Sequence, residues 1–350
     1  MIALSEFDEA TLKKWLSARG FLPSHAHRLL RAYYASHAAP NLEQLDLGKS
    51  LARTLRDESV LLQSRIIKRH DSADQTIKLL LDLDRGGTVE TVLMPAYRAD
   101  RAAGCVSSQI GCAMGCDFCA SARGGLVRNL SSGEIVEQFI HLRRECASLH
   151  RRLGSLVFMG MGEPLQNLDS VADAILRIAR PEMGNLGFRA MTVSTVGIVP
   201  GIEELAERNL GVHLAVSLHA PDDATRAKIV PTARRWKVAD IIAAARRFAQ
   251  HTGRYVTIEY CLLSDVNDSD EQASELANLL DGFRAHVNLI PYNWIGAGLS
   301  ETHYAKPQSE RMERFMRILR DRRVVAHFRR TRGDDVSAAC GQLRHAAVAT

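Results

Sequence analysis

The sequence reads Gly111-Cys112-Ala113-Met114-Gly115-Cys116-Asp117-Phe118-Cys119 at its most informative point. Three cysteines, Cys112, Cys116 and Cys119, stand here at C-x3-C-x2-C spacing, and the loop supplies no fourth thiol. A structural zinc site is closed by four ligands, whereas an iron–sulfur cluster held by three thiolates keeps one iron open for a substrate or cofactor. The spacing therefore favours a cluster. The alternatives are a zinc loop with a distant fourth ligand and cysteines that only pack.

The composition around this loop is that of a globular protein of 350 residues, 46% hydrophobic and 24% charged, which suits a barrel-sized core with an accessory piece. No run of about eighteen apolar residues predicts a membrane span. Residues 1–9 are acidic and lack the basic region of a signal peptide. Seven cysteines is an odd number, and the four outside the loop are scattered, which argues against a secreted disulfide framework. We therefore expect a cytoplasmic protein that binds no membrane.

Positive charge is concentrated rather than spread. The net charge is +5, and nine arginines lie between Arg311 and Arg332. Arginine-rich faces suit a polyphosphate partner such as nucleic acid. For residues 311–323 a solvated helix face is an equal alternative. Residues 329–332 adjoin a Gly-Asp-Asp turn, and we expect them to contact phosphates.

The first hundred residues divide into two parts. Residues 1–60 predict a basic helical domain, in which Tyr33 and Tyr34 follow the apolar helical positions of residues 22–30. This domain contacts RNA or serves only for packing, and the sequence favours neither. Residues 61–97 are rich in Ile, Val, Leu and Thr and predict a β extension with a hairpin turn at residues 84–87.

Residues 98–343 alternate short apolar strands with helices, which predicts parallel strands joined by right-handed crossovers. The expected strands are 104–108, 155–159, 190–194, 212–218, 255–263 and 286–291, with a last one near 324–328. The expected helices are 132–149, 168–179, 202–208, 238–251, 269–280 and 308–320. The fold class is therefore α/β, a partial (β/α)6 barrel with the helical domain and the β extension added. Residues 344–350 form a tail.

Small and polar residues follow the predicted strands, where the chemistry of parallel barrels is located. These segments are Gly160-Met161-Gly162-Glu163-Pro164, Ser194-Thr195-Val196-Gly197, Ser217-Leu218-His219-Ala220 and Asn288-Leu289-Ile290-Pro291-Tyr292-Asn293. Each alone is a weak signal. Together they predict a site at one rim of the barrel, facing the cysteine loop.

Five motifs in order resemble one known family. They are Cys105-Val106-Ser107-Ser108-Gln109-Ile110-Gly111-Cys112, Gly160-Met161-Gly162-Glu163-Pro164-Leu165, Ser217-Leu218-His219-Ala220-Pro221, Asn288-Leu289-Ile290-Pro291-Tyr292-Asn293, and Thr331-Arg332-Gly333-Asp334-Asp335 with Ala339-Cys340-Gly341-Gln342-Leu343. The chain resembles the RlmN/Cfr family of radical S-adenosylmethionine (SAM) enzymes from about residue 20 to Leu343. These enzymes methylate a ring carbon of an adenosine in 23S ribosomal RNA.

The resemblance implies two cofactors. Cys112, Cys116 and Cys119 would hold one [4Fe–4S] cluster per chain, whose open iron binds SAM, and two SAM molecules would be used per turnover. The family's SAM-contacting positions match Gly162, Glu163, Ser194, Ser217, Leu218, His219 and Asn293. A glycine lets the backbone approach the ligand, and a carboxylate can accept hydrogen bonds from an ammonium group.

The resemblance also implies three catalytic residues. Cys340 would carry the methyl group as S-methylcysteine, Cys105 would release the product by forming a transient disulfide with Cys340, and Glu90 would be the proton acceptor. Cys146 and Cys261 have no counterpart in this scheme, and we interpret them as ordinary buried cysteines.

The expected partners follow from the same resemblance. They are ribosomal RNA, transfer RNA as a second substrate, and a reductant such as flavodoxin or ferredoxin, with the protein a monomer. RlmN enzymes modify C2 of adenosine 2503 and Cfr enzymes modify C8. We expect C2, with C8 or another RNA as the alternative. Two further hypotheses are an RNA-binding protein with structural zinc and a radical SAM enzyme that acts on a small molecule or peptide, which would have no use for Cys340.

Overall fold

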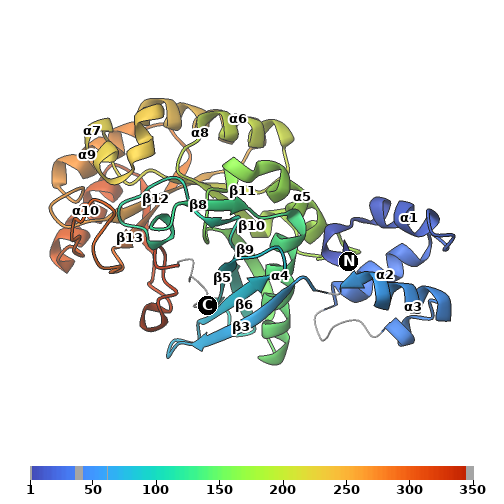
Figure 1. Cartoon of the computed structure of the whole chain (residues 1–350). Helices are drawn as coiled ribbons and strands as arrows, with labels where there is room; N and C mark the ends of the chain where they lie inside the picture. The colour runs from blue at the N-terminus through green and yellow to red at the C-terminus, as the bar shows by residue number, and fades with distance from the viewer. Residues whose placement is uncertain (1, 36–41, 61, 344–350) are drawn as a thin grey trace.

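In the computed structural model, which describes residues 2–35, 42–60 and 62–343, one mixed sheet organises the molecule (Figure 1). Within these residues the sheet has ten strands, in the order β14-β13-β12-β11-β10-β9-β6-β5-β4-β3. The tail expected at residues 344–350 lies outside the described part. No helix of that part is both long enough and apolar enough to span a bilayer.

The barrel wall is built from parallel strands, each hydrogen-bonded to the next. They are β6 (Arg101–Cys105), β9 (Arg152–Phe158), β10 (Met191–Thr195), β11 (His213–Ser217), β12 (Val256–Leu262), β13 (Ala285–Pro291) and β14 (Val325–Phe328). The predicted α/β barrel is therefore confirmed. The first strand begins three residues earlier than expected, at Arg101, and Gly104 lies inside it. A Cβ at Gly104 would stand 2.8 Å from side-chain atoms of both Leu142 and Leu156, so glycine here lets the covering layer close in.

Helices cover the outer side of the curved sheet (Figure 1). They are α4 (Ser132–Ser148), α5 (Leu168–Ala179), α6 (Val199–Arg208), α7 (Asp223–Ile229), α8 (Val238–Thr252), α9 (Asp270–Leu279) and α10 (Ser309–Asp321). Capping boxes at Ser131 and Ser269 start α4 and α9, and left-handed Gly253 ends α8. The sequence pattern does not predict the short α7, and α6 starts earlier than expected because Pro200 fits its first turn.

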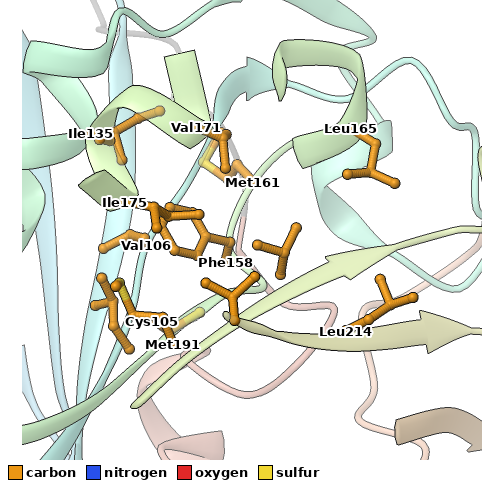
Figure 2. Packing of buried hydrophobic residues seen from close by; sticks show 14 of the residues in the cluster. Cys105, Val106, Ile135, Phe158, Met161, Leu165, Val171, Ile175, Met191 and Leu214 are labelled. Atoms are coloured by element: carbon orange, nitrogen blue, oxygen red, sulfur yellow. The ribbon is translucent and has the colours of Figure 1, made fainter. Parts of the chain in front are cut away.

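Apolar side chains fill the layer between the sheet and these helices. Ile135 of α4 and Val171 and Ile175 of α5 pack near Phe158 of β9 (Figure 2). All four are at most 1% exposed. Burying one such side chain contributes about 1.5–3 kcal/mol, so this layer holds the strands rigidly beneath the site.

The β extension continues the barrel sheet. Strands β3 (Ser64–Asp71), β4 (Ile77–Leu83) and β5 (Thr88–Pro95) are antiparallel, and β5 pairs antiparallel with β6. In this register Val92 faces Cys105 across the β5–β6 pair. Because side chains alternate along a strand, Glu90 lies on the same face of the sheet as Cys105. The extension thus brings a carboxylate to the inner face of the barrel.

The N-terminal unit comprises α1 (Glu9–Ser17), α2 (His25–Tyr33) and α3 (Lys49–Glu58), closed by the parallel pair β1 (Ile2–Ala3) and β2 (Ser59–Val60). It stands beside α4 and α5 at one side of the barrel (Figure 1). Tyr33 and Tyr34 are at most 1% exposed and contact each other edge to face at 5.4 Å. These two tyrosines therefore pack within the unit and offer no surface to RNA.

A buried polar network joins the N-terminal unit to α4. Glu137 Oε1 accepts hydrogen bonds from Ser5 Oγ and the Gln63 amide, both at 2.8 Å, and Oε2 accepts one from Ser64 Oγ. Ser64 Oγ also lies 3.0 Å from Nε2 of His141. Burial raises the pKa of Glu137 to about 7 and lowers the pKa of His141 to about 4.

This network predicts a pH dependence of stability. Because the pKa of Glu137 is raised in the folded state, the folded protein binds a proton more tightly than the unfolded chain. The stabilisation is full below about pH 4.5 and is lost as the pH rises through about 7. We expect Glu137→Gln to become more stable relative to wild type between pH 5 and pH 8, by up to roughly 3 kcal/mol. Thermal unfolding at both pH values measures this. Since His141 is present in both proteins, its titration cancels, and a pH-independent difference would contradict the prediction.

Candidate active site

A pocket opens where the barrel strands end, as the sequence predicted. Its empty space, including the part open to solvent, is about 940 Å³. Its walls come from the cysteine loop and from the residues that end or follow β9, β10, β11, β12 and β13. Of the expected site residues it contains Cys112, Cys116, Cys119, Gly162, Glu163, Ser194, Ser217, His219, Asn293 and Cys340. Segments far apart in the sequence thus supply one cavity.

The cysteine loop is held by tight turns and polar anchors. It follows β7 (Gln109–Gly111), which pairs with β8 (Leu126–Asn129). Gly111 has φ +72°, and a Cβ there would stand 1.9 Å from the carbonyl oxygen of Gly125, so only glycine fits. Asp117 accepts hydrogen bonds from the Ser300 amide at 2.7 Å and from the Tyr304 hydroxyl at 2.6 Å. These contacts tie the loop to the segment after β13.

The three thiols of the loop suit an iron–sulfur cluster. Burial raises the pKa of Cys112 to about 12 and also raises those of Cys116 and Cys119. A bound cationic centre would supply the positive charge that thiolates need in such a place. Among residues 2–35, 42–60 and 62–343, no three candidate ligands are close enough together to hold a single metal ion. The set of three soft donors that face an open cavity fits a cluster with a free coordination position.

Glycines bring the backbone after β9 close to the inner wall. Gly162 has φ +100°, and a Cβ there would stand 2.5 Å from Cβ of Gln109. A Cβ at Gly160 would stand 2.6 Å from Oγ of Ser107. Neither position has room for a side chain, so the segment lies flat against β7 and leaves the cavity open.

Both carboxylate oxygens of Glu163 accept hydrogen bonds from backbone amides of the pocket wall. Glu163 is 3% exposed, and its carboxylate accepts hydrogen bonds from the amides of Val196 at 2.7 Å and Leu165 at 3.0 Å. Burial raises its pKa to about 7. The carboxylate thus joins the loops after β9 and β10 while it faces the cavity.

His219 is neutral and fixed. Its Nδ1 accepts a hydrogen bond from the amide of Cys261 at 3.0 Å, and its ring meets Phe118 edge to face at 4.8 Å. Burial lowers its pKa to about 3. Because Nδ1 is an acceptor, the single ring proton is on Nε2, which leaves a donor at the pocket wall.

Two other expected SAM contacts are placed differently. Leu218 is fully buried and does not line the pocket; its carbonyl accepts a hydrogen bond from Nε of Arg226 at 2.9 Å. Asn293 lines the pocket but already donates to the carbonyl of Cys340 at 3.1 Å and accepts from Thr331 at 3.2 Å. Asn293 therefore anchors the Cys340 loop in addition to facing the cavity.

Cys340 is exposed at the pocket wall on a well-anchored loop. The carbonyl of Gly341 accepts from the Ala120 amide at 2.7 Å, next to the cysteine loop. On the opposite side, Nζ of Lys78 donates to the carbonyl of Ser337 at 3.1 Å. The loop is thus held between the cysteine loop and the β extension, which fixes where its thiol can reach.

Cys105 and Glu90 lie deeper, on the inner face of the sheet. Cys105 is 8% exposed, and burial together with the nearby Cys340 raises its pKa to about 12. All seven cysteines are free thiols in the structure. Glu90 forms an ion pair with Lys78 at 2.9 Å, and both side chains are 8% exposed. Cys105 is thus near Cys340, and Glu90, paired with Lys78, lies on the same face of the sheet as Cys105.

The structure places Arg329, one of the expected phosphate contacts, in the pocket wall. Its Nη1 lies 3.5 Å from Oε2 of Glu259. The pKa of Arg329 is raised by the neighbouring Cys340 and by Glu259. Sequence reasoning missed Glu259, although a glutamate within an apolar barrel strand is itself a signal of an inner polar site. It also missed that Cys261 lines the pocket.

Known proteins account for this arrangement. The sequence profile of the Radical SAM superfamily matches residues 106–277. A protein of Opitutus terrae named "Probable dual-specificity RNA methyltransferase RlmN 1" is 52% identical over 342 residues, which are 98% of this chain and 96% of that protein. The chain belongs to the RlmN family of radical SAM enzymes. An RlmN protein of Bacillus subtilis, also named a probable dual-specificity RNA methyltransferase, is 38% identical over 97% of this chain and 91% of its own length.

A solved structure agrees with this RlmN family assignment over the whole fold. The crystal structure of a radical SAM methyltransferase from Sphaerobacter thermophilus superposes with a TM-score of 0.93 at 42% identity, and it covers 98% of this chain and 99% of that one. Membership of the radical SAM superfamily implies a [4Fe–4S] cluster and SAM as cofactors. The three thiols and the open pocket described above fit both groups.

Proposed function

We propose that this RlmN family member is a radical SAM methyltransferase that methylates C2 of adenosine 2503 in 23S ribosomal RNA, with transfer RNA as a second substrate. One observation carries the proposal. The three thiols suited to a cluster and the exposed thiol of Cys340 line one pocket, with Cys105 near Cys340 and Glu90 on the same face of the sheet as Cys105. A radical enzyme acting on a small molecule would have no use for this second set of residues.

Cys112, Cys116 and Cys119 would hold the cluster, and Glu163, His219 and the residues around them would hold SAM. When bound, the cluster and SAM would supply hydrogen-atom abstraction by one-electron cleavage of SAM. The surrounding walls have an anchoring role. They fix the reactants at one rim and keep bulk water from the radical.

Cys340 would act first as a nucleophile. Its thiolate would attack the methyl carbon of one SAM, and a sulfur–carbon bond would form as the electron pair of the broken sulfonium bond leaves with S-adenosylhomocysteine. Abstraction of one hydrogen atom from the S-methyl group, by the chemistry that the cluster and a second SAM would supply, would let the carbon on Cys340 add to the adenine ring. The exposed position of Cys340, between the pocket and solvent, supports a carrier that must meet both SAM and RNA.

Cys105 and Glu90 would complete the turnover. Glu90 would take the ring proton, and its carboxylate is held by an ion pair with Nζ of Lys78 at 2.9 Å. The unpaired electron left on the ring would pass to the oxidised cluster. The thiol of Cys105 would lose its proton and attack the sulfur of Cys340, so that a disulfide forms as the carbon–sulfur bond breaks, and the released carbon would take up a proton to become the methyl group. A dithiol reductant restores both thiols, and flavodoxin or ferredoxin supplies the electron for the cluster.

The rest of the chain would serve RNA binding. We propose residues 1–60 as an RNA-contacting domain, 61–97 as a β extension that holds the Cys340 loop, and 98–343 as the radical SAM core. Residues 329–332 are the proposed phosphate contacts, and among them Arg330 is exposed beside the pocket. The enzyme would work as a monomer in the cytoplasm. Extruding the adenosine from its RNA costs roughly a few kcal/mol of unstacking, which these contacts would offset.

The test uses anaerobically reconstituted protein, deuteromethyl SAM, a reductant and protein-free 23S ribosomal RNA. Digested nucleosides are compared by mass spectrometry with 2-methyladenosine and 8-methyladenosine. Labelled 2-methyladenosine is the expected product, and labelled 8-methyladenosine would assign the protein a Cfr-like position instead. Cleavage of SAM without any labelled nucleoside would show that the RNA substrate is wrong. A colourless protein with tightly bound zinc would refute the cluster itself.

A further inference from the structure

Trp294 stands out beside the pocket. It directly follows Asn293, which lines the cavity, and its side chain is 72% exposed. An exposed large apolar side chain on a stable protein is ordinary when it stands alone on a distant surface. Here it adjoins the pocket in which a nucleotide would meet Cys340, so its position calls for a function.

The backbone around Trp294 is fixed on both sides. The carbonyl of Trp294 accepts a hydrogen bond from Nε2 of Gln342 at 3.2 Å, and Asn293 donates to the carbonyl of Cys340 at 3.1 Å. The carbonyl of Ile295 accepts from Nη2 of Arg123 at 2.6 Å. The indole is thus presented from a braced segment. Binding a partner there costs little ordering of the backbone.

Positive charge lies beside the indole. At the Cβ position of Gly296, Nη2 of Arg123 is 3.4 Å away and Cζ2 of Trp294 is 3.9 Å away, so this guanidinium and the indole edge lie on the same side of the segment. A second cavity of about 370 Å³ adjoins this segment and is lined by Asn293, Cys340 and the run of residues 329–332, which includes three arginines. Asn293 and Cys340 line both cavities.

Single-stranded RNA binds to surfaces that combine an exposed aromatic ring with nearby arginines, because bases stack on the ring and phosphates contact the positive charge. We propose that Trp294 is a positioning residue that stacks on an unpaired base directly flanking the adenosine that enters the pocket. This inference rests on the proposed function. Stacking there would hold the flanking nucleotide outside while its neighbour is turned toward Cys340.

The experiment measures binding and turnover for wild type, Trp294→Ala, Trp294→Phe and a matched control, Tyr97→Ala. Tyr97 is fully exposed, in the turn between β5 and β6, and this turn lies at the opposite end of the strands from the pocket. The ligands are a 23S ribosomal RNA fragment that contains the target adenosine and the same fragment with an abasic site at each flanking position in turn. Methylation of Cys340 by SAM without RNA shows that every variant keeps an intact site.

We expect Trp294→Ala to raise the dissociation constant and the KM for the intact fragment about tenfold, with kcat little changed. Trp294→Phe should retain most of the affinity, and Tyr97→Ala all of it. For one of the two abasic fragments, wild type should bind as weakly as Trp294→Ala binds the intact fragment. Wild type and Trp294→Ala should bind this abasic fragment with equal affinity. An equal loss of affinity for every fragment, or no loss for the intact one, would overturn the inference. Failure of wild type to methylate any RNA would instead overturn the proposed function.

Discussion

Cys340→Ala is expected to abolish RNA methylation, with a loss of at least about 1,000-fold, while the cluster still forms and SAM is still cleaved. Cys340 is the exposed thiol of the pocket, and an alanine there can accept no methyl group. The hydrogen bond from the Asn293 side chain is accepted by the backbone carbonyl of residue 340, so the substitution leaves this contact of the loop in place. The measurement is labelled methyladenosine formed and 5′-deoxyadenosine formed in the same reaction.

The matched control for this loss is Cys146→Ala. Cys146 is 1% exposed on α4 and does not line the pocket, so its removal tests the general effect of losing a buried thiol. We expect methylation by this variant to stay within about twofold of wild type. Methylation by Cys340→Ala at a rate close to that of the control would exclude a cysteine-bound methyl carrier at residue 340.

Cys105→Ala is expected to accumulate a covalent protein–RNA species instead of product. Without the sulfur that attacks Cys340, the carbon bridge between Cys340 and the adenine ring has no partner to release it. Because a thioether joins the two, the species should survive heating with thiols and denaturant but should vanish on treatment with ribonuclease. A denaturing gel with labelled RNA detects it as a retarded band.

Two comparisons make this second prediction specific. The double variant Cys105→Ala/Cys340→Ala should form no retarded band, because the carrier is missing. Wild type should form none at steady state. If Cys105→Ala turned over normally and without a band, another group would have to release the product, and Cys261, which lines the same pocket, would be the first candidate.

Much of the fold is predictable because the parallel strands of the barrel carry continuous apolar runs. The helix expected at residues 168–179 occurs as α5 (Leu168–Ala179), and most other helices and strands differ from their predicted bounds by one or two residues. The cysteine loop is equally plain, because its function is encoded in local spacing. The pattern fails where a contact depends on long-range packing. The Arg329–Glu259 pair joins residues 70 positions apart, and no local spacing announces it.

The same reason explains the tyrosines and Leu218. Tyr33 and Tyr34 follow a basic helix and have the composition of a nucleic-acid surface, but the fold turns both rings inward. Leu218 belongs to a recognisable motif, yet only its backbone is used, to hold the buried Arg226. Motif matching identifies the positions that matter without telling which atoms of each residue act.

The contacts between the β3–β4 hairpin and the Cys340 loop bear on when this enzyme becomes competent during its synthesis. The hairpin tip between β3 and β4 holds residues near Cys340: Ser72 Oγ donates to Asp335 at 2.5 Å, and the Gly333 amide donates to Asp74 at 3.2 Å. These partners lie about 260 residues apart, so the ribosome makes the β3–β4 hairpin early and the loop that carries Cys340 late. The last barrel strand, β14, ends only about twelve residues before Cys340, so closure of the barrel and arrival of the methyl-accepting thiol both come late in synthesis. The hairpin tip that receives the loop is by then already made.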